Sequence, residues 1–360
     1  MLNVPRHLQV NASPTTNIWL HRYAVLTAVA TLGLIGMGGL VTSHGVGMAV
    51  PDWPTSYGYN MFALPFKFWK GGVFYEHTHR LWASGVGLLT VILAVWLWLK
   101  DSRAWLRWLG VGAVFLVVLQ GVLGGLRVVL FKDQIGIFHA ALAQLFFGLL
   151  CAIALFTSQW WTGRAGSPLP ADGAHGVTRP TNNGLARLFL FTTVLIFIQL
   201  LIAATMRHQH AGLAIPDFPL AYGKVWPDTS AAAVAGYNAR RVEIGGENSI
   251  TTGQIWLQMA HRAMAVVILG AVAFCAWKVR SSGFSRFGPP EGGTPNLMQR
   301  LTLAWLGVIF IQAGLGAWTT WSNKAADVAT AHVVVGALSL VMGALLTIIT
   351  FRFSGKARTE

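Results

Sequence analysis

Eight apolar runs, each about twenty residues long, most constrain what this chain can fold into, because an α-helix of that length crosses the hydrocarbon core of a bilayer. Stretches such as LLTVILAVWLWL are apolar throughout, whereas the strands of a transmembrane barrel would alternate. The sequence therefore predicts an all-α polytopic membrane protein. The eight predicted transmembrane helices lie at 23–42, 81–99, 108–130, 136–157, 187–206, 255–277, 301–320 and 329–351.

Lys and Arg residues are distributed unequally between the two sides of the membrane. The segments that include both termini carry 15 of them, and the alternate segments carry 9 over a similar total length. The positive-inside rule therefore predicts a cell-membrane protein with both termini in the cytoplasm and the long connections 43–75 and 207–253 outside. The formal net charge of +14 comes mostly from residues that flank the spans, so a nucleic-acid partner is not expected.

The chain is an internal duplication. The segment GMAVPDWPTSYG at 47–58 matches GLAIPDFPLAYG at 212–223, and three further matches follow in the same order: EHTHRLWA with QMAHRAMA, QGVLGGL with QAGLGAW, and IFHAALAQLFFGLL with TAHVVVGALSLVMG. Each repeat holds four spans, so the two copies share one orientation and a pseudo-twofold axis along the membrane normal. The predicted domains are an N-terminal four-helix bundle (1–157), a cytoplasmic linker (158–186) and a C-terminal four-helix bundle (187–360).

Four of the 11 histidines recur at equivalent positions in the two repeats. His79 pairs with His261 and His139 pairs with His332, each expected within about a turn of the outer end of an even-numbered span. Two facing imidazoles inside a four-helix bundle are typical of a haem iron bound from both sides, whereas zinc or copper would need further ligands. For a single histidine the alternative is a hydrogen bond to a backbone carbonyl. The repetition favours two haem sites toward the outer face.

The residues beside these histidines predict different roles for the two pockets. Glu76 and its counterpart Gln258 each precede a histidine by three positions, so they share its helix face. A partly desolvated carboxylate exchanges protons near neutral pH and an amide does not, although a helix N-terminus also favours an acid. Arg80 and Arg262 are expected to bind haem propionates, or otherwise to extend to the membrane surface. His77 is expected to be a polar group at the membrane surface, and the alternative is a second proton shuttle.

With these features the sequence resembles the haem A synthase family over nearly its whole length. The resemblance is carried by the eight spans in two repeats, the Glu-x-x-His-Arg element at 76–80, its counterpart at 258–262, the later histidines His139 and His332, and the Pro-Asp-Trp-Pro segment at 51–54. It implies an oxidoreductase that oxidises the C8 methyl of haem O to a formyl group by successive hydroxylations.

The resemblance also implies roles for individual residues and partners. The iron of the substrate, haem O, would be bound by His79 and His139, with Glu76 as the catalytic residue. The iron of the cofactor, haem b, would be bound by His261 and His332. The implied partners are the farnesyltransferase that makes haem O, an electron donor that the sequence does not identify, and the lipid bilayer, and a homo-oligomer is left open.

The sequence departs from the family pattern in the first outer loop. Many bacterial relatives carry a cysteine pair where this chain has Val50 and Ser56, so a thiol-assisted step is not expected. The arginine that often precedes this loop is Thr42 here, while Arg207 occupies the matching position in the second half.

Two alternative functions remain open from the residues. The main one is a non-catalytic dihaem membrane cytochrome that exchanges electrons with quinol. The second is a haem or small-molecule transporter, which is disfavoured because the charged residues gather at the ends of the spans. The outer-loop histidines His44, His208 and His210 are also candidate metal ligands.

Overall fold

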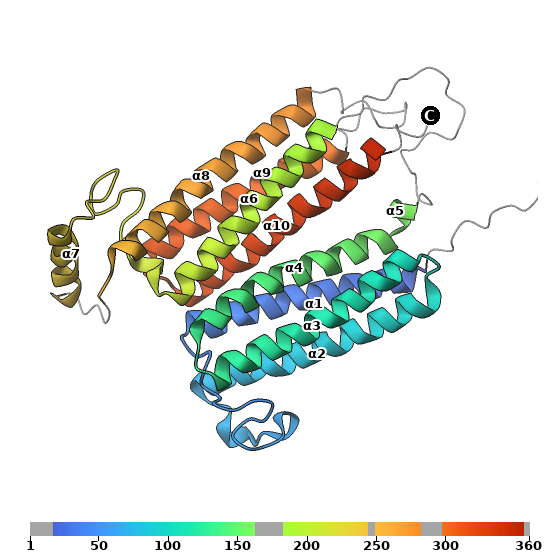
Figure 1. Cartoon of the computed structure of the whole chain (residues 1–360), viewed down its shortest axis with the longest axis horizontal. Coiled ribbons are helices and arrows are strands. Elements are labelled where there is room, and N and C mark those ends of the chain that lie inside the picture. Colours follow the sequence, from blue (N-terminus) through green and yellow to red (C-terminus); the bar gives the residue numbers. More distant parts are fainter. Residues whose placement is uncertain (1–16, 163–182, 244–248, 282–296, 356–360) are drawn as a thin grey trace, which may run out of the picture.

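The computed structural model describes residues 17–162, 183–243, 249–281 and 297–355, and within them eight long helices form two groups of four (Figure 1). The first group is α1 (Ile18–Ser43), α2 (Gly71–Lys100), α3 (Ala104–Val129) and α4 (Asp133–Thr157). The second is α6 (Asn183–His208), α8 (Thr252–Ser281), α9 (Leu297–Trp321) and α10 (Ala326–Gly355). These eight helices are long and apolar enough to cross a membrane, so the predicted all-α, eight-span protein is confirmed.

Each group is a four-helix bundle. In the first, α1 and α3 each pack against α2 and α4, and in the second, α6 and α9 each pack against α8 and α10. The bundles meet where α1 and α4 contact α10 and where α4 contacts α6. Gly39 of α1 lies so near α10 that an added Cβ would come within 3.0 Å of the Thr330 side chain. This arrangement is consistent with the predicted pseudo-twofold axis.

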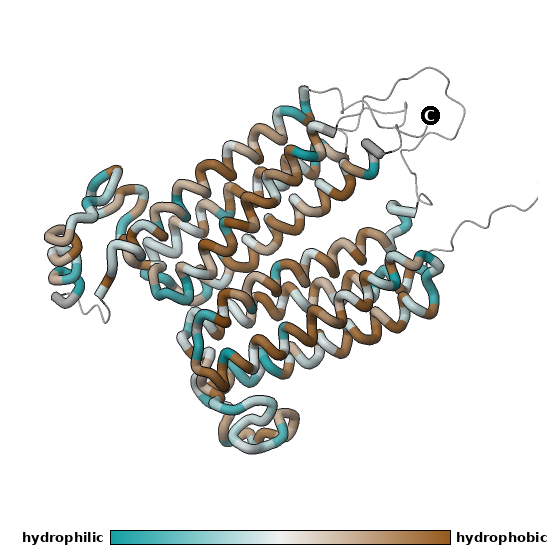
Figure 2. The backbone as a smooth tube through the Cα atoms, in the orientation of Figure 1, coloured by the Kyte–Doolittle hydropathy of each residue, from teal (hydrophilic) through white to brown (hydrophobic). Residues whose placement is uncertain are grey.

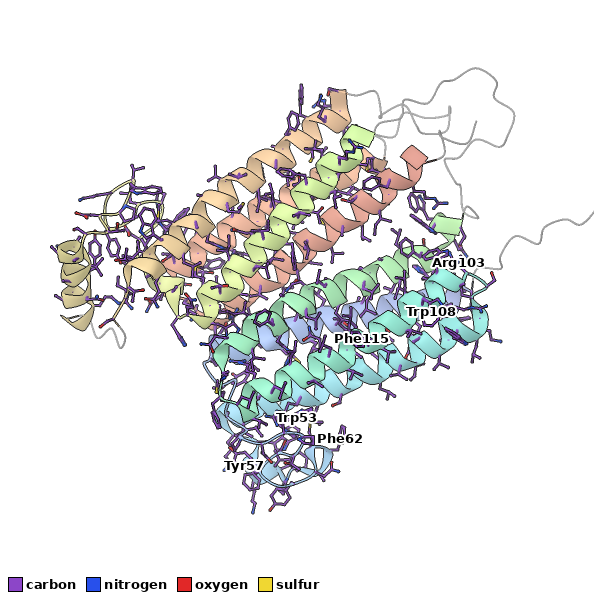
Figure 3. The ribbon with its side chains drawn as sticks, in the orientation of Figure 1. Trp53, Tyr57, Phe62, Arg103, Trp108 and Phe115 are labelled. Carbon is purple, nitrogen blue, oxygen red and sulfur yellow. The ribbon has the colours of Figure 1, made fainter. Side chains whose placement is uncertain are left out.

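The hydropathy of the helices agrees with a lipid surround. Figure 2 shows apolar residues along most of the length of the bundles and hydrophilic residues gathered toward their ends. Large apolar side chains remain exposed on the flanks: Trp108 and Phe115 of α3 are 63% and 67% exposed (Figure 3). Threonine hydroxyls within the spans are satisfied locally, as where Thr27 and Thr31 donate to the carbonyl four residues earlier.

One end of the molecule carries the long connections 44–70 and 209–251, and we call it the loop end. The connection 44–70 includes the short 3-10 helices η2 (Met61–Ala63) and η3 (Phe66–Phe68). The connection 209–251 includes η4 (Ala211–Leu213) and the helix α7 (Ala231–Glu243). Hydropathy did not predict α7, because it is too short and too polar to resemble a span.

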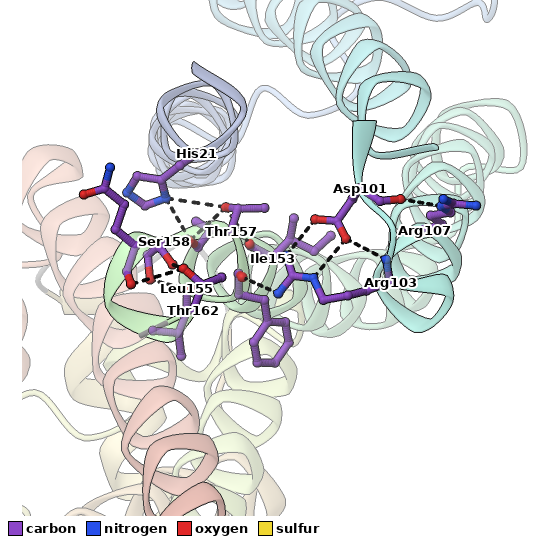
Figure 4. Close-up of polar contacts among 12 residues, drawn as sticks. His21, Asp101, Arg103, Arg107, Ile153, Leu155, Thr157, Ser158 and Thr162 are labelled. Carbon is purple, nitrogen blue, oxygen red and sulfur yellow. Dashed lines mark hydrogen bonds and ion pairs between the residues drawn. The ribbon is translucent and has the colours of Figure 1, made fainter. Parts of the chain in front are cut away.

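At the opposite end, polar contacts join the helix termini of the first bundle (Figure 4). Arg103 forms an ion pair with Asp101 at 2.6 Å and donates to the carbonyl of Phe156 at 2.9 Å. The connection between α2 and α3 is thereby attached to the last turn of α4, which leads into the short helix α5 (Gln159–Thr162). Most of the predicted linker 158–186 lies outside the described residues.

Helix α2 begins earlier than its apolar run predicts, at Gly71, and α8 begins at Thr252. The polar residues that precede the apolar run of α2 are covered by the first outer loop, whose Val50 N–H donates to Glu76 and whose Asp52 carbonyl accepts from Arg80. His79 and His261 consequently lie more than two turns inside their helices, and not within about one turn of the end as expected.

Candidate functional site

The loops that open the two repeats have the same local structure. The N–H groups of Tyr57 and the following glycine donate to the carboxylate of Asp52 at 2.6 and 2.9 Å. Those of Tyr222 and the following glycine donate to Asp217 at 2.7 and 2.8 Å. Burial raises the pKa of Asp52, but the hydrogen bonds from Gly58, Thr55 and Tyr57 outweigh it and the net pKa lies below its ordinary value.

Arg80 and Arg262 fasten these loops to their helices. Arg80 donates to the carbonyls of Asp52 and Val50 at 2.7 and 2.8 Å. Arg262 donates to the carbonyl of Asp217 at 2.7 Å. The sequence predicted propionate contacts for both arginines, and these contacts stay a prediction; in the structure both guanidinium groups donate to loop carbonyls.

Glu76 and Gln258 hold the same loops at a second point. Glu76, 4% exposed, accepts the Val50 N–H at 2.9 Å on one carboxylate oxygen and pairs with Arg80 at 2.7 Å through the other. Gln258, 3% exposed, accepts the Ile215 N–H at 2.7 Å. Both side chains therefore hold the loop backbone in the same way, and they differ in that only Glu76 carries a carboxylate.

His77 is buried by the protein itself, which the sequence did not predict. Its ring is fully shielded, with Nδ1 3.4 Å from the Ser56 hydroxyl and its centroid 4.8 Å from that of Trp69. The cause is the first outer loop, which folds over this turn of α2 and directs Trp53 against Gly125 of α3 (Figure 3). The hydropathy of neighbouring residues does not predict that a loop folds back over a helix.

The second histidine pair has the spacing of two ligands on one iron. The ring centroids of His261 and His332 lie 6.3 Å apart, with 72° between the ring planes. Two imidazoles that bind one metal ion from opposite sides through bonds of about 2 Å have centroids about 6 Å apart, whatever their rotation about the common axis. The pair fits a haem iron.

The first pair, His79 and His139, lies within electrostatic range of each other. In all four rings Nδ1 is buried and forms no hydrogen bond with a described residue. A glycine on a neighbouring helix makes room for three of the rings. An added Cβ would contact the ring at 3.2–3.4 Å for Gly38 with His79, Gly124 with His139, and Gly316 with His332.

The donor set also bears on the kind of metal. Within the described residues no three His, Cys, Asp or Glu side chains gather in a way that would hold a metal ion. A porphyrin supplies four iron ligands itself, so two imidazoles complete its iron, whereas zinc needs more from the protein. The outer-loop histidines form no such group, and the ring of His44 stacks on Tyr75 at 4.5 Å.

Comparison with known proteins gives a family match along most of the chain. The model of the COX15-CtaA family, described as cytochrome oxidase assembly protein, matches residues 21–344. A heme A synthase of Shouchella clausii is 26% identical over 274 residues, which cover 74% of this chain and 78% of that protein. A heme A synthase of Granulibacter bethesdensis is 25% identical over 361 residues, covering 90% and 85%.

Proposed function

The chain belongs to the COX15-CtaA family of cytochrome oxidase assembly proteins, and from this premise we propose that it oxidises the C8 methyl of haem O to a formyl group by successive hydroxylations. The predicted family is confirmed: the chain is an oxidoreductase of haem A biosynthesis, like the relatives named heme A synthase. The reaction at the C8 methyl and the haem b cofactor are the proposal. The observation that supports a haem in the second bundle is the 6.3 Å separation of the His261 and His332 rings, and the support for the reaction is the similarity to heme A synthases.

The residues divide between two sites. His79 and His139 hold the substrate haem O in the first bundle, and His261 and His332 hold haem b in the second. A bound haem b supplies one-electron chemistry, while the protein binds, orients and shields. The domain boundaries 1–157, 158–186 and 187–360 belong to this proposal as well.

Glu76 is the residue that we propose to move protons in the first site. Its support is the comparison of the repeats, because Gln258 keeps the hydrogen bond to the loop backbone and cannot exchange a proton. The carboxylate also has Arg80 at 2.7 Å, which holds it in place on the helix face that it shares with His79.

The substitution Glu76→Gln tests this role, with Gln258→Glu as the matched control. We expect Glu76→Gln to lower conversion of haem O to haem A by about 100-fold or more, because the proton acceptor is lost. Haem content and protease resistance of the first loop should remain, since glutamine makes the same backbone contact at position 258. Conversion and haem content are measured by extraction and chromatography.

The outcomes separate the alternatives. Normal conversion by the Glu76→Gln variant would remove Glu76 from the chemistry. A wild-type protein that binds two haems, reacts with quinol and never forms haem A would support the non-catalytic dihaem cytochrome.

Location and partners complete the proposal. The protein is a multi-pass membrane protein. We propose that it lies in the cytoplasmic membrane with both termini inside and the loop end outside, next to the farnesyltransferase that makes haem O and an electron donor. The support is the excess of Lys and Arg on the segments that include the termini.

A further inference from the structure

A group of positive side chains lies where the two bundles meet at the loop end. Arg207, in the last turn of α6, extends from the second bundle to α1 of the first. Its guanidinium donates to the Gly39 carbonyl at 2.5 Å and to the Ser43 hydroxyl at 2.6 Å. Its Nε is buried and has no hydrogen-bond partner among the described residues.

Two further cations lie beside Arg207, and with it we call them the basic cluster. Burial and then the charge of Arg207 lower the pKa of Lys324, in the α9–α10 connection, so these two groups lie near each other. Lys324 extends under the second loop at Gly212, whose added Cβ would lie 4.0 Å from its Cδ. Arg127 lies under the first loop, where an added Cβ at the equivalent Gly47 would come 2.8 Å from a guanidinium nitrogen.

Arg207 and Lys324 have no counter-charge among the described residues. Neither Arg207 nor Lys324 forms an ion pair with a described carboxylate, since the ion pairs there join Glu76 with Arg80 and Asp101 with Arg103. Half-buried like charges destabilise a protein unless an anion neutralises them. Arg207 and Lys324 are therefore suited to an anionic ligand.

The position of the cluster indicates which anion. Arg207 lies within electrostatic range of His332, and Arg127 lies within range of His79 and His139. A porphyrin held by these histidines carries two propionate carboxylates. The arginines predicted for them, Arg80 and Arg262, fasten the loops, and the buried Nε of Arg207 has no hydrogen-bond partner among the described residues. Arginine and lysine bind carboxylates through short, charge-assisted hydrogen bonds.

We infer that Arg207 and Lys324 bind the propionate carboxylates of the haem in the second bundle, with Arg127 adding a third positive charge beside them. This inference rests on the proposed function in one respect, that His261 and His332 hold a haem. Arg207 would then link the carboxylate edge of one haem to α1, and Gly38 of α1 faces the ring of His79 in the other site.

The test compares haem with haem dimethyl ester, in which both carboxylates are neutral. Full-length protein carrying His79→Ala, which leaves the second site intact, is produced in cells starved of haem and titrated with each compound. We expect the ester to bind about tenfold more weakly or worse, because charged hydrogen bonds are lost. In the same His79→Ala background, which we call the parent, the double substitution Arg207→Gln, Lys324→Gln should weaken binding of haem, the acid, to about the affinity that the parent has for the ester. The affinity for the ester itself should change little.

The controls make the failures distinguishable. Lys67→Gln in the exposed part of the first loop removes a positive charge outside the cluster and should preserve the preference for the acid. If the double variant does not accumulate, Lys324→Gln alone should still reduce the preference. Equal affinity of the parent for acid and ester, or an undiminished preference in the cluster variants, overturns the inference while leaving the histidine ligands in place. A parent protein without a bis-imidazole haem spectrum would instead contradict the proposed function.

Discussion

The glycines that face the histidine rings are the residue-scale feature on which the haem sites depend most directly. At Gly316 an added Cβ would come within 3.2 Å of the His332 ring, whereas Gly314 on the same helix has open space around it. We expect Gly316→Val to displace the ring and reduce the haem retained by the second site at least severalfold. Gly314→Val should retain wild-type haem, and the absorbance of the purified variants in detergent measures both.

Equal haem loss in both glycine variants would mean that a bulkier side chain disturbs the packing of α9 in general, and that the ring contact is unimportant.

Several site residues were predictable because they occupy equivalent positions in the two repeats. The four paired histidines and the exchange of Glu76 for Gln258 stand out once the repeats are aligned, without any structure. The partners of Arg80 and the burial of His77 were not predictable. Both depend on an outer loop that folds back over its helix, and the hydrogen bonds to its carbonyls have no counterpart in the residue pattern.

At the scale of elements, the eight spans follow from hydropathy, and their ends do not. A run of apolar residues marks the part of a helix that lies in lipid, while a helix continues wherever its backbone and polar side chains find partners. In α2 those partners belong to the first loop, so the helix starts at Gly71 although the apolar run starts ten residues later, at position 81. The same reasoning applies to α8.

The first loop should depend on pH through Asp52. Because its hydrogen bonds hold the pKa of Asp52 below the ordinary value, this carboxylate stabilises the loop above about pH 4, and the stabilisation is lost as pH falls through the lower, folded-state pKa. We expect cleavage of the segment 51–59 by pepsin to increase steeply from about pH 4 to about pH 2. Asp52→Asn, which cannot ionise, should be cleaved faster at pH 4 and should lack that extra steepness.

The matching aspartate of the second loop provides the control for this prediction. Asp217→Asn should leave the pH dependence of the first loop unchanged. If the wild-type and Asp52→Asn loops share one pH profile, the carboxylate does not control the stability of the loop.

At the scale of the whole molecule, the duplication explains how one chain acquires two similar sites with different roles. Each bundle contributes a histidine pair, a loop fastened by an arginine, and an acid or amide under that loop. The bundles then meet at α1 and α10, and Arg207 joins them at the loop end. This junction was beyond sequence reasoning, because nothing in either repeat indicates which of its faces contacts the other.

The central claim is that the histidine pairs hold two haems, and the haem content of the purified full-length protein tests it most directly. We expect the wild-type protein to show a bis-imidazole b-type spectrum, and extraction to give haem b together with haem O, an alcohol intermediate or haem A. The double variant His261→Ala, His332→Ala should lose the haem b of the second site and retain the haem bound by His79 and His139. A colourless wild-type protein after expression with ample haem, or an unchanged spectrum in the double variant, would contradict the account.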